Sequence, residues 1–253
     1  MQDRTEPYIS RVRPDERHNI FTEDIDYRKT EKKSIWGKGY EKTLELFKLD
    51  PIKGGRWLNL AAGDGRYNNQ LLKYADSVVA SDIDAEALSK LQRHTPKKYR
   101  DKLTTVAFNL NGDFPLKDGS FNGIFCTGIL HLFSRPVLEK ISKEMLRILK
   151  PGGRLILEFP TEIKRIGRDG SLITFGDEPN YSIADARSYL QELVGSSSTQ
   201  GIIEEVVEDF PNANPPFTFH SKIILLECFK TTGNEDKDRL IVTSMGKRTQ
   251  VLT

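Results

Sequence analysis

Short apolar runs typical of β-strands alternate with helical patterns through the middle of this 253-residue chain. The five strand-like runs are residues 57–60, 77–81, 103–110, 121–127 and 154–159, and the three helical patterns are residues 66–74, 85–92 and 136–149. Strands that alternate with helices form βαβ units, whose right-handed crossovers place parallel strands in one sheet and helices on both of its faces. This feature therefore predicts an α/β fold with a doubly wound, mostly parallel sheet.

The later part of the chain has a different pattern. A helical pattern at 183–194 precedes two strand-like runs at 202–207 and 217–229, with three prolines between the two runs. Two consecutive strands joined by a short loop pair antiparallel. We therefore expect a seven-stranded sheet that ends in a closing antiparallel strand pair.

Charge and periodicity divide the chain into three parts. Residues 1–33 are dominated by charged and polar side chains and are expected to form a mobile or partly ordered N-terminal arm. Residues 34–230 are expected to form the folded domain, with an irregular insertion at 160–181 that has three glycines and little periodicity. Residues 231–253 form a C-terminal tail, in which 240–242 either add a strand or are disordered.

Composition bears on the function class and on the location of the protein. The chain has 38 basic and 36 acidic residues, and its formal net charge of +2 gives no general electrostatic reason to bind nucleic acid. Its N-terminus lacks the apolar segment of a secretory signal, and no apolar run approaches the roughly 18 residues that span a bilayer. We therefore expect a cytoplasmic protein without a membrane partner.

Reactive and metal-binding residue types are sparse. Cys126 and Cys228 each lie inside an apolar strand-like run, so two buried free thiols are expected. The four histidines are far apart and lack the spacing of metal ligands, so no metal is expected. The oligomeric state is not determined by the sequence.

A loop of small residues, Ala61-Ala62-Gly63-Asp64-Gly65, follows the first strand of the alternating region. Small residues let a ligand approach the backbone closely, and the N-terminus of a following helix favours an anionic group. Many α/β proteins need such a tight turn only for packing. The loop alone is therefore weak evidence for a ligand.

Asp82 strengthens the case for a ligand because it ends the second strand, about twenty residues after the loop. A carboxylate in this position can accept hydrogen bonds from the hydroxyl groups of a ribose, and a solvated surface aspartate is the alternative. A nicotinamide-dependent dehydrogenase is less favoured. Its fingerprint has a third glycine where Asn68 follows Gly63 and Gly65 in this chain.

Taken in order, the motifs of this region resemble those of the class I, Rossmann-like methyltransferases that depend on S-adenosylmethionine (SAM). The motifs are the loop and Asp82, Asn109-Leu110-Asn111, Phe114-Pro115-Leu116, Asp118-Gly119-Ser120-Phe121-Asn122 and Leu149-Lys150-Pro151-Gly152-Gly153. The resemblance is greatest to the small-molecule-type group, methyltransferase type 11, and covers about residues 57 to 160. The motifs are specific for SAM binding and say almost nothing about the acceptor.

The resemblance implies a role for each matching residue. Asp82 would bind the ribose hydroxyls, and Ile83 would pack on adenine. Asn109 and Leu110 would meet the adenine edge. The other residues implied to bind SAM, or its product S-adenosylhomocysteine, are Asn59, Ala61, Ala62, Gly63, Gly65, Cys126, Thr127 and Gly128.

Four positions depart from the family pattern. Asn59, Asn109 and Asn122 stand where the family usually has an acidic residue, and Ala61 stands where it usually has a glycine. Asparagine accepts a hydrogen bond but carries no charge. These departures keep open the alternative of a SAM-binding protein without turnover that acts as a partner or regulator.

The groups that would assist the transfer itself are less well marked. His131 follows the fourth strand at the expected rim of the site, where it is either a general base or a structural histidine. Asp64, Arg66 and Glu158 either face the cleft or have turn and surface roles, and the second interpretation is the simpler one.

The acceptor is expected to meet residues outside the resemblance. Tyr27, Trp36 and Tyr40 either roof the substrate pocket or form a hydrophobic cover for the sheet. Arg165 and its basic neighbours within residues 164–168 are expected to be a solvated charge run rather than an anion site. We therefore expect methyl transfer from SAM to a small-molecule acceptor. An RNA methyltransferase acting on tRNA or rRNA is the alternative.

Overall fold

The computed structural model describes residues 8–10, 25–175, 178–194, 201–231 and 240–241 of the chain. Most of the predicted N-terminal arm (1–33) and C-terminal tail (231–253) lies outside these residues. The limits of the arm, domain and tail therefore stay predictions. No helix in the described ranges is both long and apolar enough to cross a membrane.

Five parallel strands form the centre of one sheet, in the spatial order β4–β3–β2–β5–β6. In chain order they are β2 Arg56–Leu60, β3 Ser77–Asp82, β4 Leu103–Ala107, β5 Phe121–Thr127 and β6 Leu149–Gly167. The order reverses beside β2, because β3 lies on one side of β2 and β5 on the other. Open α/β sheets bind ligands at such a switch point, outside the carboxyl ends of the strands.

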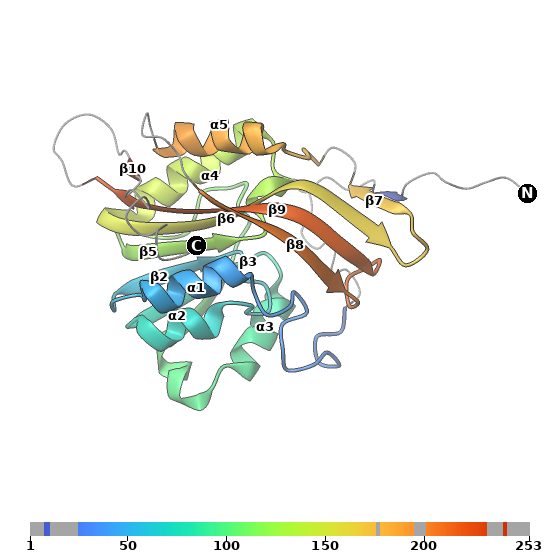
Figure 1. Cartoon of the computed structure of the whole chain (residues 1–253). Helices are drawn as coiled ribbons and strands as arrows, with labels where there is room; N and C mark the ends of the chain where they lie inside the picture. Colours follow the sequence, from blue (N-terminus) through green and yellow to red (C-terminus); the bar gives the residue numbers. More distant parts are fainter. Residues whose placement is uncertain (1–7, 11–24, 176–177, 195–200, 232–239, 242–253) are drawn as a thin grey trace, which may run out of the picture.

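Two antiparallel strands close the sheet beyond β6. β9 (Phe217–Lys230) pairs with β6, and β8 (Ile202–Phe210) pairs with β9 at the outer edge. The predicted seven strands and the closing antiparallel pair are therefore confirmed. Figure 1 shows β6, β8 and β9 running on together past the helices that cover the centre of the sheet.

Helices cover both faces of the sheet, as the alternation predicts (Figure 1). The helices are α1 Glu41–Leu49, α2 Asn68–Tyr74, α3 Ala85–His94, α4 Arg135–Ile148 and α5 Ile183–Val194, with short 3-10 turns η1 Lys97–Lys102 and η2 Leu130–Leu132. Alternate residues of β3 show the two layers, because Val78 packs with α1 and α2, whereas Val79 packs with α4 and α5. The period-two alternation of a strand thus serves two helical layers.

The prediction of an irregular insertion at 160–181 is wrong for much of that segment. β6 continues to Gly167, and β7 (Leu172–Phe175) pairs antiparallel with its far end. Along this part of β6, Ile163 and Arg165 are buried, whereas Glu162 and Lys164 are exposed. The two-residue period of a strand is present. The hydropathy of the sequence does not show it, because one of the buried positions is an arginine.

Three short strands extend the sheet beyond the predicted seven. One is β7, and the second is β1 (Tyr8–Ser10), which pairs parallel with β7. The third is β10 (Leu240–Ile241), which pairs antiparallel with the end of β9 and confirms the added strand considered for the tail. Other boundaries differ by a few residues, as where the helix predicted at 66–74 begins at Asn68.

Candidate functional site

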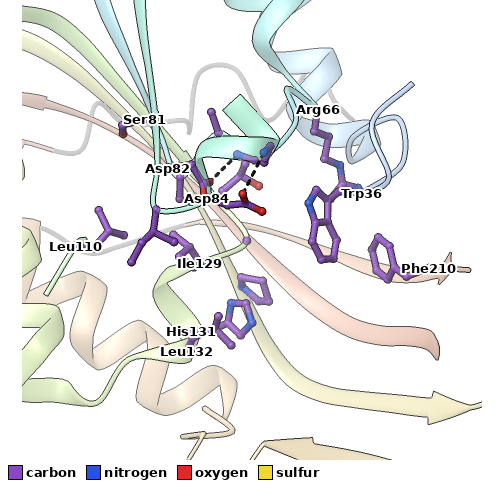
Figure 2. A pocket seen from close by; sticks show the side chains of 18 of the residues that line it. Trp36, Arg66, Ser81, Asp82, Asp84, Leu110, Ile129, His131, Leu132 and Phe210 are labelled. Atoms are coloured by element: carbon purple, nitrogen blue, oxygen red, sulfur yellow. Dashed lines mark hydrogen bonds between the residues drawn. The ribbon is translucent and has the colours of Figure 1, made fainter. Parts of the chain in front are cut away.

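A pocket opens at the carboxyl ends of β2, β3 and β5, at the switch point of the sheet. Thirteen residues that the sequence analysis placed at a site line it together. They are Tyr27, Trp36, Tyr40, Ala61, Ala62, Gly63, Asp82, Ile83, Asn109, Leu110, Thr127, Gly128 and His131. Figure 2 shows Asp82 and Asp84 on one side of the pocket, His131 on the other, and Trp36 beside Phe210.

The loop after β2 presents backbone rather than side chains to the pocket. Ala61 and Gly63 have positive φ angles of 55° and 52°, in the left-handed region that favours glycine. A Cβ placed on Gly63 would lie 3.2 Å from Nε1 of Trp36, so a larger residue there would press on the indole. Because α2 starts only at Asn68, it is the loop itself that faces the pocket.

Asp82 connects the loop to the end of β3. One carboxylate oxygen accepts a hydrogen bond from the Gly63 N–H at 2.8 Å, and the other accepts from the Asp84 N–H at 3.0 Å. Burial raises the pKa of Asp82 to about 6, although these two backbone donors act in the opposite direction. Asp84 caps α3 by accepting from the Glu86 and Ala87 N–H groups. This part of the pocket, from Ala61 to Gly63 with Asp82, is called the glycine end below.

Three of the predicted cofactor residues, Asn59, Gly65 and Cys126, do not line the pocket. Asn59 is buried on β2, and its Nδ2 donates to Oδ1 of Asn68 at 3.4 Å. Gly65 lies against Leu91 of α3, and Cys126 is fully buried in the core as a free thiol. These residues lie behind the pocket wall.

The segment before α1 lies over the glycine end and is held there by a buried ion pair. Nζ of Lys90 lies 2.7 Å from the Asp64 carboxylate, and both side chains are fully buried. Asp64 also accepts from the Ile35 N–H at 2.8 Å and from the Ser34 hydroxyl. Asp64 lies in a turn, as predicted, but its side chain is buried rather than at the surface. It anchors the segment that carries Trp36.

A second buried polar cluster lies below the pocket. Oε1 of Glu158 accepts from the Tyr67 hydroxyl at 2.6 Å, which itself accepts from the Tyr40 N–H at 2.6 Å. Oε2 of Glu158 accepts from the hydroxyl of Thr127, a residue of the pocket wall. Burial raises the pKa of Glu158 to about 7. The predicted surface role of Glu158 is wrong, because its side chain is fully buried and accepts hydrogen bonds from Tyr67 and Thr127.

Arg66, also predicted in a turn or surface role, lines the pocket. Its guanidinium lies over the Tyr40 ring at 4.2 Å and 2.6 Å from a carboxylate oxygen of Glu208. Its side chain is only 8% exposed. Arg66 therefore connects the N-terminal segment to the edge strand β8.

Aromatic side chains form the wall opposite the glycine end. Phe210 of β8 and Phe217 and Phe219 of β9 are buried, and their rings pack on one another at 5.3 and 5.9 Å. Trp36 meets Phe210 edge-on at 5.5 Å and so joins the two ends of the pocket. This wall, with Tyr40 and Pro160, is called the aromatic end below.

His131 lies on η2 and borders the aromatic end together with Arg165. Its Nε2 lies 3.9 Å from Oε1 of Glu178, and its buried Nδ1 has no hydrogen-bond partner among the described residues. Burial, and then the neighbouring Arg165 guanidinium, hold the pKa of His131 well below its usual range. The imidazole is therefore neutral at physiological pH.

Arg165 does not belong to a solvated charge run. Its guanidinium makes two parallel contacts to the Glu178 carboxylate, at 2.6 and 2.7 Å, and the side chain is buried. Lys164 and Arg168 are exposed, and Arg168 pairs with Asp209 at 2.8 Å. Lys164 and Arg165 are neighbours on β6, and neighbouring positions of a strand face opposite sides of the sheet. One of these basic side chains is therefore exposed and the other is buried.

Several pocket residues were not predicted from the sequence. The lining residues absent from the prediction include Ser81, Asp84, Phe108, Phe133, Pro160, Phe210, Phe217 and Phe219. Ser81 and Asp84 flank Asp82, so proximity to that strand end was an available signal. The phenylalanines of β8 and β9 have none, because only the long β6–β9 ladder brings them to the pocket. Within the described ranges, no three His, Cys, Asp or Glu side chains gather as metal ligands.

Comparison with known proteins identifies the central domain. Residues 58–157 match a family model described as a methyltransferase domain. A demethylmenaquinone methyltransferase from Clavibacter sepedonicus is 29% identical over 163 residues, which are 64% of this chain and 62% of that protein. A phosphoethanolamine N-methyltransferase from Triticum aestivum is 30% identical over 116 residues, 46% of this chain and 23% of that protein. The chain thus spans less than two thirds of either relative.

Solved structures share the fold. The YcgJ protein from Bacillus subtilis superimposes with a TM-score of 0.56 at 17% identity, covering 77% of this chain and all of that one. A putative methyltransferase from Bacillus halodurans gives a TM-score of 0.52 at 18% identity, covering 76% of this chain and all of that one. Residues 58–157 therefore match a methyltransferase domain, on a fold that the chain shares with these solved structures and with a pocket at the switch point of the sheet.

Proposed function

We propose that the protein transfers the methyl group of SAM to a small-molecule acceptor. The observation that carries this proposal is a single pocket with two different ends. The glycine end offers backbone and a carboxylate, and the aromatic end offers buried rings with His131. A cofactor and an acceptor bound at the two ends would meet near Thr127 and Gly128.

The residues of the glycine end fit SAM. The loop leaves no side chain between its backbone and the pocket at Gly63, and Asp82 offers a carboxylate for the ribose hydroxyls. Ile83 and Leu110 supply apolar surface for adenine. When bound, SAM supplies a methyl group activated by a positively charged sulfur.

The protein's own contribution would be alignment and the exclusion of water. A displacement at a methyl carbon needs the nucleophile in line with the leaving sulfur, and holding two reactants in this geometry supplies much of the rate. Trp36 and Tyr40 lie over the pocket, and the Asp64–Lys90 pair fixes the segment that carries them. The same cover would keep water from the reacting groups.

A small acceptor is favoured over RNA by the walls of the aromatic end. An RNA site needs unpaired basic side chains along its approach. Here the two arginines of the pocket, Arg66 and Arg165, each pair with a carboxylate. The names of the two relatives also refer to small molecules, a demethylated menaquinone and phosphoethanolamine.

Binding and turnover are tested separately. Calorimetry should show binding of SAM and S-adenosylhomocysteine, and NAD should not compete. Tight NAD binding without any response to SAM would refute the cofactor assignment.

Turnover is tested with labelled SAM, which should transfer its methyl group into a metabolite extract but not into purified tRNA or rRNA. Label in RNA alone would favour the RNA alternative, and binding without transfer to either would favour a SAM-binding protein without turnover.

A further inference from the structure

The charges around the aromatic end balance. Arg165 lines the pocket with His131, and it pairs through both terminal nitrogens with Glu178, whose side chain is 6% exposed. Arg66 makes a single contact with one oxygen of Glu208. A phosphate or carboxylate entering this end would have to displace a buried carboxylate from its arginine, which is costly. The pairing therefore favours an acceptor without charge.

The shape and chemistry of the wall favour a flat ring. The buried rings of Phe210, Phe217 and Phe219 line the pocket. Trp36 lies beside Phe210 and meets it edge-on (Figure 2). Aromatic rings pack well edge-to-face and offset at these distances. An aromatic acceptor would make the same kind of contact with several walls at once.

His131 supplies a proton acceptor at the border of this wall. The Glu178 carboxylate, 3.9 Å from Nε2, favours the ring tautomer with its proton on Nε2. That leaves a lone pair on Nδ1, the buried atom for which the described residues provide no partner. A buried polar atom without a partner is costly unless a ligand group satisfies it.

From these three observations we propose that the acceptor is an uncharged aromatic compound carrying a phenolic hydroxyl, which donates to Nδ1 of His131. The proposal rests on the proposed function and specifies its acceptor. The hydroxyl oxygen attacks the methyl carbon of SAM as its proton passes to His131. The carbon–oxygen bond forms, the carbon–sulfur bond breaks, and an aryl methyl ether and S-adenosylhomocysteine result. Glu178 is a positioning residue that offsets the charge gained by the imidazole.

The weak basicity of His131 limits the kind of hydroxyl it can serve. Burial and Arg165 keep the pKa of His131 low, and the Glu178 carboxylate that pairs with Arg165 lies in the loop before α5. A weak base takes a proton readily only from an acidic hydroxyl. A phenol, with a pKa of about 10, comes closer to this condition than an aliphatic alcohol, which is far less acidic. The structure therefore favours phenols over alcohols of the same size.

Three compounds with one ring system test the acceptor class on the full chain. Naphthol carries the phenolic hydroxyl, naphthylmethanol an aliphatic hydroxyl, and naphthoate a negative charge. With labelled SAM, we expect methylation of naphthol, or of a smaller phenol tested beside it, at least tenfold faster than of the other two. Methylation of naphthoate or naphthylmethanol in preference to every phenol, or of none of the compounds, would overturn the proposal. S-adenosylhomocysteine binding by calorimetry keeps these outcomes distinct from failure of the proposed function.

Variants of His131 test the base. His131→Gln and His131→Asn should lower kcat on naphthol roughly 100-fold or more while affinity for S-adenosylhomocysteine stays within twofold. The rate of the variants should then rise roughly tenfold per pH unit as free naphtholate replaces the missing base, a response that a structural role would not produce. Lys164→Gln, on the exposed side of β6, is the matched control and should behave as the wild type. Equal losses at every pH in folded variants would overturn the role of His131.

Discussion

At the glycine end of the pocket the backbone forms the binding surface, whereas at the aromatic end side chains form it. Loop geometry, positive φ angles and a single carboxylate define the first, within one stretch of chain from β2 to β3. Rings from β8, β9 and the segment before α1 define the second, with paired charges around them. The first surface depends on local conformation, and the second depends on the packing of distant segments.

This difference explains how one fold can serve many acceptors. A backbone surface tolerates few changes, because a larger side chain at Gly63 would meet Trp36. A side-chain surface can be rebuilt by substitution without loss of the strands that carry it. We therefore expect cofactor binding and acceptor choice to respond to different mutations.

The largest expected effect concerns the anchor of the N-terminal segment. Asp64→Asn leaves the fully buried Lys90 ammonium without its carboxylate partner, which should lower the free energy of unfolding by about 3–5 kcal/mol. Chemical denaturation measures the change. Asp26→Asn, whose partner Lys29 is 84% exposed, is the control and should cost far less, because water screens the exposed pair. Equal effects of the two substitutions would show that the buried pair does not anchor the segment.

The next effect separates the two ends of the pocket. Asp82→Ala removes the carboxylate proposed to accept the ribose hydroxyls, and each lost charge-assisted hydrogen bond is worth roughly 1.5–3 kcal/mol of binding. Calorimetry should show weaker binding of S-adenosylhomocysteine in a variant that is still folded by circular dichroism. The exposed Asp113→Ala is the control. Unchanged affinity in Asp82→Ala would place the carboxylate outside the cofactor site.

A smaller effect concerns Glu158, the buried acid that accepts a hydrogen bond from Thr127 in the pocket wall. The pKa of Glu158 is raised from 4.5 to about 7, so between these values the folded chain holds a proton that the unfolded chain releases. Its contribution therefore makes the free energy of unfolding fall, by roughly 1–3 kcal/mol, as the pH rises from 4.5 to 7. Glu158→Gln should remove this decline.

Denaturation at several pH values measures the slope, with Glu205→Gln as the control because that side chain is 81% exposed. If the slope of Glu158→Gln matches that of the wild type, another group titrates in this range and Glu158 is already ionised in the folded chain.

The smallest expected effect is that of Asn59→Asp. The new carboxylate would stand beside Asn68, whose buried Nδ2 has no hydrogen-bond partner among the described residues and could donate to it. Because Asn59 lies behind the pocket wall, we expect equal or slightly tighter binding of S-adenosylhomocysteine by calorimetry. Loss of binding in a folded variant would show that Asn59 belongs to a network that a charge disrupts.

Much of the glycine end could be predicted from the sequence. The apolar runs, the loop residues and Asp82 follow one another within a short segment, and their order along the chain sets their order in space through the βαβ rule. Cys126 and Cys228 are buried free thiols, as predicted. The prediction was wrong in placing Asn59, Gly65 and Cys126 at the pocket, because a motif identifies a turn but does not show which side chains face away from the ligand.

The aromatic end shows the limit of sequence reasoning. Phe210 and Phe219 had no pattern that distinguished them from other strand residues, and Arg165 looked like part of a charged run. Glu178, which neutralises Arg165, was assigned to an irregular segment. Each gains its role only from partners far away in the sequence.

The sequence by itself therefore determined the parallel sheet, the placement of the loop at its switch point and the match of residues 58–157 to a methyltransferase domain. These depend on hydropathy period, turn chemistry and the handedness of crossovers, all of which act over short distances along the chain. Only the tertiary structure decided that Asp64 and Arg165 are buried and paired with opposite charges, and that Glu158 is buried among hydroxyl donors. Burial of a charge depends on the arrival of an opposite charge from another element, and that arrival is a property of the packed fold.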